Sequence, residues 1–484
     1  MEIPAPPTPS NPVDTLSDVA EYHVENFGCR ASRADGEAIA ADLRHRGFDA
    51  ASRPAAAHVV IVNTCSVTAE ADRQARAYLR RIRRQNPAAR IVVTGCYAQR
   101  APEEVAALAG IDAVVGNSHK SMVAGIAAEM VKGTVIPYEE RTATEGEGPA
   151  VEQLVAPSAR EAPTFVPLGR ILHDDAFAHA ELATLPFAAD APQTRPNLKV
   201  QDGCGNRCSF CIIPTTRGPS RSVPLAACLD NVRRFVDRDG KELVLSGINL
   251  GRWGRDLAPA HRFEDLVAAI LTQTKLPRLR LSSIEPMDWS PDLLALYREF
   301  TTGLHPRLAR HAHLPLQSGS DAILRRMHRR YRPWHYAERL AALRALLPDA
   351  AIGADVMIGF PGETGALFRE SFDFIAEQPF TYLHLFPFSA RPGTLAWELH
   401  RNDPVPPPVV QERMAALRAL ITQKSAAFRA SFLDRTLSAV TVEPGEAVTD
   451  NFLKLSLDTP LPGNLLIAAR VDHLTPQGLH GASR

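Results

Sequence analysis

Three cysteines lie within eight residues of one another in this 484-residue chain, in the order Cys204, Cys208 and Cys211. Three thiolates at this spacing can bind three irons of a [4Fe–4S] cluster and leave the fourth iron open for another ligand. A structural zinc site would need four closed ligands. No histidine or fourth cysteine lies close in the sequence, since Cys228 follows 17 residues later and is expected to be a small core residue. The spacing therefore favours an iron–sulfur cluster over a zinc ion or three incidental thiols.

Three more cysteines, Cys29, Cys65 and Cys96, are spread over the first hundred residues. Each is expected to follow a strand, and strands that alternate with helices predict a small parallel sheet. The expected strands span residues 22–27, 58–62, 91–93 and 113–115, with a helix over residues 69–85. Ligands of such sheets bind beyond the carboxyl ends of the strands. The spacing alone leaves open whether these thiols share a ligand or are buried and unrelated.

A second pattern, an apolar strand followed by a polar or Gly-rich turn, recurs six times in the middle of the chain. The six strands are expected at residues 198–200, 243–245, 279–281, 312–316, 356–358 and 382–386. Six such βα units predict a partial barrel, whose active site lies at the carboxyl ends of its strands. The loop that contains Cys204 directly follows the first of them.

The predicted fold class is α/β, with a small β module at the end of the chain. We expect five segments: a disordered N-terminus (1–20), an N-terminal α/β domain with a parallel sheet (21–118), a linker or insertion (119–195), a central partial (βα)6 barrel (196–431) and a C-terminal β module (432–484). The linker carries weak periodicity and an excess of acidic residues, which is why no domain is assigned to it.

The composition excludes several classes of protein. Lys plus Arg and Asp plus Glu number 54 each, so nucleic-acid binding must rest on local patches and not on the overall charge. No stretch approaches the ~18 apolar residues of a membrane span. The first residues lack the basic and apolar regions of a secretion signal. Seven cysteines are too few for a disulfide scaffold. The expectation is a cytoplasmic protein with no membrane partner.

The sequence around the cysteines resembles a known family. The stretch CGNRCSFC (204–211) resembles the cysteine loop of radical S-adenosylmethionine (SAM) enzymes. The stretches around the three early cysteines resemble the N-terminal domain of the methylthiotransferases within that superfamily, and the best match is to the branch that modifies threonylcarbamoyladenosine in tRNA. The resemblance covers roughly residues 22–118 and 197–430, and the tail more weakly resembles a TRAM module. The supporting stretches are 27–29, 63–68, 94–99, 201–204, 280–286, 314–321 and 359–364.

This resemblance implies two [4Fe–4S] clusters. Cys204, Cys208 and Cys211 would hold the first, whose open iron binds SAM, and one electron then cleaves SAM to a 5′-deoxyadenosyl radical. A radical suits the target, an adenine C2–H that acid–base chemistry does not readily remove. Cys29, Cys65 and Cys96 would hold a second cluster, which keeps a sulfur for methylation and delivery to C2. All six cysteines would then be catalytic as well as metal ligands.

Six further residues at the barrel's strand ends are expected to contact the cofactor. Phe210 would pack on the adenine of SAM, Glu285 would accept hydrogen bonds from ribose hydroxyls, Ser283 and Gln317 would meet polar edges, and Gly359 and Gly362 would permit close approach of the backbone. A loop ion pair is the alternative for Glu285, and turn geometry alone is the alternative for the two glycines.

Two arginine-rich stretches provide local positive charge in this neutral chain. Residues 70–100 and residues 307–332 each carry a net charge of +6. The arginines of these stretches are predicted either to contact phosphates or to lie on a solvated helix face. The arginines expected to bind RNA are Arg73, Arg76, Arg80, Arg84, Arg325 and Arg329. Tyr97 and Tyr331 are expected either to stack on a splayed base or to be buried.

Taken together, the residues and the resemblance predict a methylthiotransferase that acts at C2 of N6-threonylcarbamoyladenosine at position 37 of tRNA. The expected partners are tRNA through its anticodon stem-loop, an electron donor such as flavodoxin or ferredoxin, and a sulfur donor that the sequence does not identify. One alternative is a paralogue that acts on isopentenyladenosine in tRNA or on a ribosomal protein aspartate. Another is a non-catalytic, metal-containing RNA-binding protein.

Overall fold

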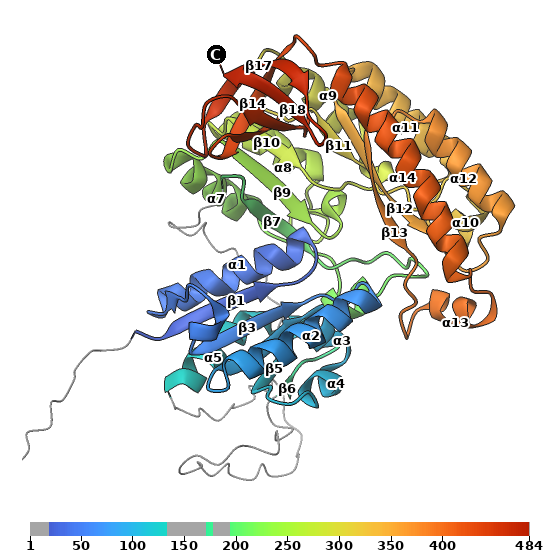
Figure 1. Ribbon diagram of the computed structural model, residues 1–484. Helices are drawn as coiled ribbons and strands as arrows, with labels where there is room; N and C mark the ends of the chain where they lie inside the picture. Colours follow the sequence, from blue (N-terminus) through green and yellow to red (C-terminus); the bar gives the residue numbers. More distant parts are fainter. Residues whose placement is uncertain (1–18, 133–170, 178–193, 484) are drawn as a thin grey trace, which may run out of the picture.

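The computed structural model describes residues 19–132, 171–177 and 194–483 (Figure 1). An N-terminal sheet with its helices lies at the bottom of Figure 1, an open barrel above it, and a small β-barrel at the top. The predicted disordered N-terminus, apart from its last two residues, and most of the predicted linker lie outside the described residues. No helix in the described part of the chain is long and apolar enough to cross a membrane.

The N-terminal part is a parallel sheet of six strands in the order β2-β1-β3-β4-β5-β6. Val60 and Val62 of β3 pack beneath α2, while Val59 and Ile61 pack beneath α1 and α5. A strand buried on both faces is typical of a parallel sheet. The elements are β1 (Glu21–Asn26), α1 (Arg30–His45), β2 (Asp49–Ala50), η1 (Pro54–Ala56), β3 (Val59–Thr64), α2 (Ala69–Gln85), β4 (Arg90–Gly95), α3 (Cys96–Arg100), α4 (Pro102–Ala106), β5 (Ala113–Gly116), η2 (Asn117–Met122), α5 (Val123–Lys132) and β6 (Ile171–Leu172).

The segment expected to be a linker contributes to this sheet. Within the predicted linker 119–195, α5 packs Val123, Ala124 and Ala127 into the core beside β4 and β5. The two residues of β6 extend the sheet by pairing with β5. The difference arises because short apolar side chains spaced three and four residues apart give a weak helical signal, although they suffice to bury one face.

The barrel contains the six predicted strands, which run parallel to one another in two sheets, β10-β9-β7-β8 and β11-β12-β13. The two-residue β8 is a further strand, and it pairs antiparallel with β7 at the edge of the first sheet. Backbone bonds join the sheets, as from Ile284 N to His313 O at 3.0 Å, so the strands form one curved wall that is open on one side. The elements are β7 (Asn197–Asp202), α6 (Ile213–Arg217), β8 (Arg221–Ser222), α7 (Leu225–Asp237), β9 (Glu242–Gly247), η4 (Leu250–Arg252), α8 (Phe263–Gln273), β10 (Arg278–Leu281), η5 (Pro286–Asp288), α9 (Pro291–Phe300), β11 (His311–His313), α10 (Asp321–Arg326), α11 (Pro333–Leu346), β12 (Ala351–Ile358), α12 (Gly365–Glu377), β13 (Tyr382–Pro387), α13 (Leu395–Asn402) and α14 (Pro407–Ala430). This architecture is the expected partial (βα)6 barrel.

The C-terminal module is a closed barrel with the strand order β14-β15-β16-β18-β17, which agrees with the predicted small β module. Its strands are β14 (Thr436–Glu443), β15 (Glu446–Thr449), β16 (Lys454–Leu457), β17 (Leu466–Leu474) and β18 (Leu479–Ser483). Arg280 of β10 donates to the backbone oxygens of Thr449 and Asp450. The ring of Phe452 lies 4.7 Å from that of His311. The module therefore covers the amino ends of the larger barrel's strands.

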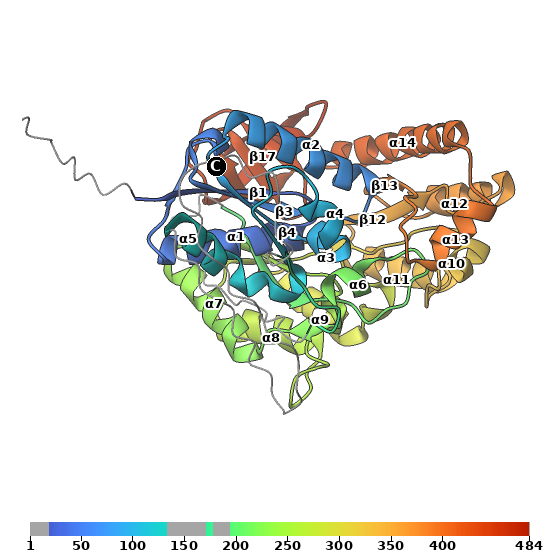
Figure 2. The same ribbon diagram turned by 90° about the horizontal axis from the view of Figure 1, so that it is seen from below.

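The carboxyl edge of the N-terminal sheet faces the barrel (Figure 2). Asn117, which follows β5, donates to the backbone oxygen of Thr216 at 2.7 Å. The N–H of Ala69, at the start of α2, donates to Ser389 Oγ just after β13 at 3.0 Å, and both ribbon views place these two ends side by side. The ends of the N-terminal strands are thereby held against the barrel's active-site end.

Candidate active site

The loop that carries Cys204, Cys208 and Cys211 is fixed at both ends by backbone contacts. The N–H of Cys204 donates to Gly218 O at 3.0 Å, and the N–H of Ser209 donates to Met327 O at 3.1 Å. Gly203 opens the loop with a φ of +72°, and a Cβ there would lie 1.9 Å from a backbone oxygen. Only glycine fits this position, so the sequence favours this path of the loop.

Hydrogen-bond donors surround the sulfurs of this loop. Asn249 Nδ2 lies 3.5 Å from Cys204 Sγ, and Arg329 Nη1 lies 3.3 Å from Cys208 Sγ. The pKa of the Cys211 thiol is raised to about 12, mainly by burial and in smaller part by the neighbouring sulfurs of Cys208 and Cys204. The three sulfurs are therefore within electrostatic reach of one another, in surroundings whose donors and positive charge stabilise thiolates.

The three early cysteines stand at the carboxyl ends of three neighbouring strands. Cys29 follows β1 and precedes α1, Cys65 follows β3, and Cys96 begins α3 directly after β4. A Cβ at Gly28 would lie 2.9 Å from Cys65 Sγ, so this glycine lets the end of β1 approach the end of β3. Burial raises the pKa of the Cys65 thiol to about 12, with further contributions from Cys96 and Cys29. The fold thus brings together residues that are distant in the sequence.

One buried arginine connects this trio to the barrel. Arg217 is 1% exposed and donates to Ser32 Oγ at 3.0 Å and to both oxygens of Asp202 at 2.9 and 3.0 Å. Burial disfavours its charge, but Asp202 and Cys96 more than offset this effect and raise the pKa of Arg217. A guanidinium held charged beside these cysteines favours their thiolate forms.

Asp35 and its cations form the ionic centre of the same junction. Asp35 on α1 contacts Lys120 at 2.5 Å, Arg217 at 3.1 Å, and also Lys199 on β7. Burial raises the pKa of Asp35, but the three cations outweigh this effect and lower it to about 2. No sequence pattern predicts this network, because its members are dispersed single charges on separate elements.

The chemistry of the thiols fits an iron–sulfur cluster better than a single ion. Three thiolates on one zinc, with Zn–S bonds of ~2.3 Å, would lie within roughly 4 Å of one another. Among the described residues, two groups of three His, Cys, Asp or Glu side chains have all their ligand atoms within 4.8 Å, and neither group contains a cysteine. All six cysteines are free thiols. Each trio is thus gathered, but around a larger space than one ion needs.

The structure places the residues expected to contact SAM in different surroundings. Glu285 accepts from Arg329 Nη2 at 2.5 Å, and both residues line a pocket together with Cys208. Phe210 is half-buried, with its ring edge-on to Phe360 at 6.5 Å. Ser283, after β10, is half-buried. Glu285 is therefore ion-paired, as its alternative reading anticipated, at a position that also borders the pocket.

Gln317, Gly359 and Gly362 take backbone conformations that turns require. Their φ values are +65°, +80° and +77°. A Cβ on Gly359 would lie 2.5 Å from Val410 Cγ2, and one on Gly362 would lie 1.6 Å from Arg326 Nη1. A side chain at either glycine would therefore collide with a neighbouring side chain of the protein. Turn geometry, the alternative given for these two positions, explains why both are glycine.

Arg329 was expected to bind RNA, but the structure places it in the interior. It is 7% exposed, and its guanidinium contacts Glu285, Cys208 and Tyr331 Oη. The prediction was wrong because the net charge of residues 307–332 does not distinguish a buried ion pair from a solvated face.

Tyr97 and Tyr331 are 0% and 1% exposed and so pack in the interior, and Cys228 lies in the barrel core as predicted.

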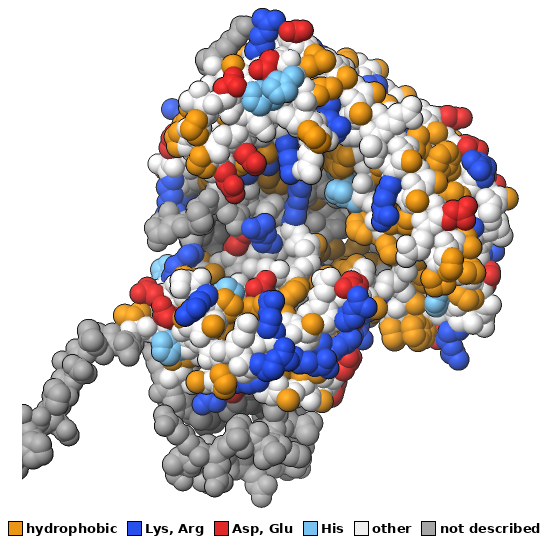
Figure 3. All heavy atoms as spheres, viewed as in Figure 1, with side chains coloured by type: hydrophobic (Ala, Val, Ile, Leu, Met, Phe, Trp, Pro, Cys, Tyr) orange, Lys and Arg blue, Asp and Glu red, His pale blue; other side chains and the backbone are white. Residues whose placement is uncertain are grey.

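The arginines of α2 form a basic surface beside the barrel. Figure 3 shows Lys and Arg side chains gathered over this helix, below a hollow between the N-terminal sheet and the barrel. Arg73, Arg80 and Arg84 are exposed, whereas Arg76 is half-buried and bonded to Tyr97 Oη at 2.7 Å. Arg325 is exposed and paired with Asp321 at 2.8 Å. Arg73 is likewise paired, with Glu70, so Arg80 and Arg84 are the members most available for phosphate contact.

Comparison with known proteins places the chain in a family. Residues 21–116 match the model described as "Uncharacterized protein family UPF0004", and residues 198–375 match that of the radical SAM superfamily. The chain is 32% identical over 448 residues to the threonylcarbamoyladenosine tRNA methylthiotransferase MtaB of Bacillus subtilis, with 90% of each protein covered. The chain belongs to the radical SAM methylthiotransferase family. A [4Fe–4S] cluster and SAM are accordingly its cofactors.

The family contains relatives with a different named product at similar identity. The tRNA-2-methylthio-N(6)-dimethylallyladenosine synthase of Chloroflexus aurantiacus is 33% identical over 427 residues, covering 87% of this chain and 81% of that protein. Among solved structures, the radical SAM methyltransferase TsrM from Kitasatospora setae has a TM-score of 0.54 at 16% identity, and it covers 78% of this methylthiotransferase and 74% of its own chain. This likeness concerns the fold alone.

Proposed function

We propose that this methylthiotransferase adds a methylthio group to C2 of N6-threonylcarbamoyladenosine at position 37 of tRNA, with SAM and two [4Fe–4S] clusters as cofactors. The observation that carries the proposal is the pair of cysteine trios at the carboxyl ends of two parallel sheets that face each other. Three free thiols per trio leave a cluster one open iron, which is what binding of SAM and binding of a sulfur each need.

The protein's own residues have defined roles in this proposal. When bound by Cys204, Cys208 and Cys211, a cluster supplies the electron that cleaves SAM. Asn249 and Arg329 point donors at two of these sulfurs, which is one of the ways in which a protein tunes a cluster. The protein otherwise positions the reactants and excludes water.

The second trio has a separate role. Cys29, Cys65 and Cys96 would hold the cluster that carries the sulfur, and Arg217 would provide positive charge beside them. The closed ionic junction around Asp35 keeps this edge of the N-terminal sheet against the barrel. An electron donor such as flavodoxin or ferredoxin and a source of sulfur complete the proposed partners.

The basic surface of α2 is the proposed contact with the tRNA backbone. Replacing Arg80 and Arg84 together by alanine is expected to weaken tRNA binding and to reduce the slope of log affinity against log salt by about two, because each phosphate contact releases a counterion. SAM cleavage without tRNA should not change. Arg233 and Arg234, exposed on α7, form the matched control pair. An unchanged salt slope in the α2 variant would remove this helix from the RNA interface.

Mass spectrometry of tRNA nucleosides tests the proposed substrate directly. In a strain that lacks this protein, the 2-methylthio form of threonylcarbamoyladenosine should disappear and the unmodified threonylcarbamoyladenosine should accumulate. Loss of the methylthio form of dimethylallyladenosine instead would favour the activity named for the Chloroflexus relative. Unchanged nucleosides would contradict both assignments.

A further inference from the structure

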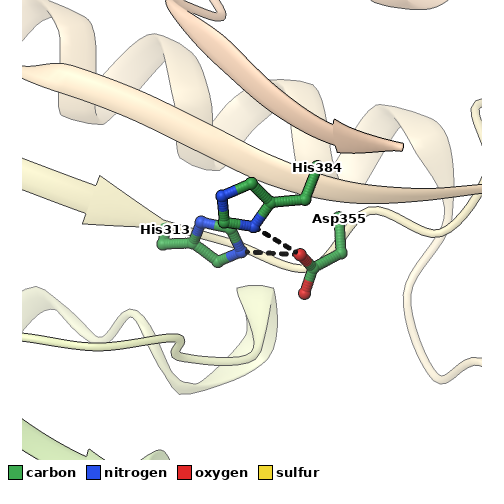
Figure 4. A group of neighbouring side chains, drawn as sticks. All are labelled: His313, Asp355 and His384. Carbon is green, nitrogen blue, oxygen red and sulfur yellow. Dashed lines mark hydrogen bonds and ion pairs between the residues drawn. The ribbon is translucent and has the colours of Figure 1, made fainter. Parts of the chain in front are cut away.

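The inner wall of the barrel carries a polar cluster on three neighbouring strands. His313 of β11, Asp355 of β12 and His384 of β13 point toward one another (Figure 4). His313 Nε2 and His384 Nδ1 each lie 3.2 Å from Asp355 Oδ1. Tyr382 Oη lies 3.0 Å from His313 Nδ1 and 2.7 Å from His311 Nε2. The five side chains form a continuous chain of polar contacts across the wall.

The register of the strands places this cluster on the concave face. His313 pairs with Gly353 and Gly353 pairs with Tyr382, while Asp355 pairs with His384 two residues further along. The alternating residues of the same strands pack outward into the apolar core under the helices: Ala312, Ile352, Ala354, Val356, Leu383 and Leu385. A barrel interior that is simply a packed core is filled with apolar, branched side chains. Polar side chains at these positions indicate a face that contacts a ligand or solvent.

One side of this face is open to solvent. The side chains become steadily more exposed across the wall, from 5% for His313 through 24% for Asp355 to 51% for His384. A hydrogen bond joins His384 to Asp355, and His313 Nε2 makes an ion-pair contact with the same carboxylate oxygen. Since these contacts already account for the approach of both rings to the carboxylate, no metal ion is needed to explain the cluster.

Arg30 faces this wall from the N-terminal part. It is the first residue of α1, directly after Cys29, and it is exposed to solvent. Its guanidinium is within electrostatic reach of Tyr382 and His311 on the wall, and of Arg280. Within the described residues, Arg30 makes no ion pair or side-chain hydrogen bond, whereas Arg280 is paired with Glu242 at 2.7 Å. Arg30 is thus an exposed cation without an ionic partner in the described part of the chain, next to Cys29 and within electrostatic reach of the polar wall.

We propose that Arg30 and the wall formed by His313, Asp355, Tyr382 and His384 bind a carboxylate-bearing substituent on N6 of the target adenosine. This inference rests on the proposed function and deepens it. A threonylcarbamoyl group ends in an amino-acid carboxylate with a hydroxyl beside it. Arg30 would pair with the carboxylate, and the histidines and Tyr382 would bond to the hydroxyl and urea atoms. An anionic ligand meets a guanidinium best through charge-assisted bonds.

The same arrangement explains selectivity against an apolar substituent. A dimethylallyl group would cover Arg30 and His384 without providing a single acceptor. A site built to hydrogen-bond its substrate rejects an analogue that lacks the partner, because its own polar groups are then left unpaired. The inference therefore separates two activities that sequence identity to the relatives, at 32% and 33%, leaves equally close.

The test uses anticodon stem-loop RNAs that differ only in the N6 substituent: threonylcarbamoyl, its methyl ester, and none. The cluster-loaded wild-type enzyme should bind the carboxylate form at least about tenfold more tightly than the ester. In Arg30→Met this ratio should fall to about one, while SAM cleavage without RNA and iron content stay at the wild-type level. Arg33→Met is the matched control, since Arg33 is exposed on α1 and its ion pair in the described part of the chain is with Glu37, on the same helix.

The outcomes separate the two proposals. If the wild type makes no methylthio product from the threonylcarbamoyl RNA, the proposed function fails. If it makes product but shows no preference for the carboxylate over the ester, or if Arg30→Met keeps that preference, the inference is overturned. Should Arg30→Met lose iron, His384→Ala replaces it, since this residue lies on the barrel and away from the cysteines. His384→Ala should weaken binding of the threonylcarbamoyl RNA several-fold and leave binding of the unsubstituted RNA unchanged; equal loss for both RNAs also contradicts the inference.

Discussion

Replacing Cys65 by alanine is expected to abolish the methylthio product while leaving SAM cleavage intact. Cys65 is 6% exposed and lies between the ends of β1 and β4, in electrostatic contact with Cys29 and Cys96. Removing it leaves two of the three thiolates that would hold the second cluster. The first trio lies on a different loop, fixed by its own contacts to Gly218 and Met327, so its chemistry should continue.

Two other cysteine variants make this result specific. Cys208→Ala removes a member of the first trio and should eliminate both deoxyadenosine and product. Cys228→Ala removes a buried thiol of the barrel core and should retain both activities. Deoxyadenosine and 2-methylthio nucleosides are quantified by mass spectrometry after anaerobic reduction. Full product from Cys65→Ala would falsify the assignment of two separate roles.

Replacing Asp35 by asparagine is expected to lower the free energy of unfolding by about 3 kcal/mol, because the buried Lys120 loses its carboxylate partner, while Lys199 and Arg217 then share Asp202 alone. Asp35 is 2% exposed and joins the N-terminal sheet to β7 and α6. Asp42→Asn on the same helix is the control, because its pair with Arg46 is partly exposed and should contribute less than about 1 kcal/mol. Urea denaturation of the anaerobically purified variants measures the difference.

The pH dependence of this stabilisation has a definite sign. The pKa of Asp35 is about 2 in the folded protein, below its ordinary value of 3.8. The contribution of Asp35 is therefore complete above about pH 4 and is lost as the pH falls toward 2. Asp35→Asn should flatten this part of the stability curve. An unchanged acid limb, together with wild-type stability at neutral pH, would show that the junction does not depend on this ion network.

Local signals in the sequence predicted the elements that position the cysteines. The helix predicted over residues 69–85 is α2 (Ala69–Gln85), because Thr68 accepts from the N–H of Ala71 at its start and Asn86-Pro87 ends it. The predicted strand over 312–316 is shorter and earlier, as β11 (His311–His313). After His313 the chain turns into the Gln317 bend, whose positive φ no strand pattern reveals.

Long-range polar contacts were beyond sequence reasoning. Arg329 lies in a run of charges that looks solvated, yet its ion pair with Glu285 forms between residues 44 positions apart. One part of the polar wall is visible in the sequence: His311 and His313 are two residues apart on one strand, so their side chains lie on the same face. Only the register of β11, β12 and β13 shows that Asp355 and His384 share this face.

Counting iron and sulfide in anaerobically reconstituted protein tests the central claim most directly. The wild type should contain about eight of each per chain, and the variant with alanine at Cys29, Cys65 and Cys96 about four, with its SAM cleavage preserved. About four per chain in the wild type, or no loss in the triple variant, would contradict the presence of a second cluster on the N-terminal sheet.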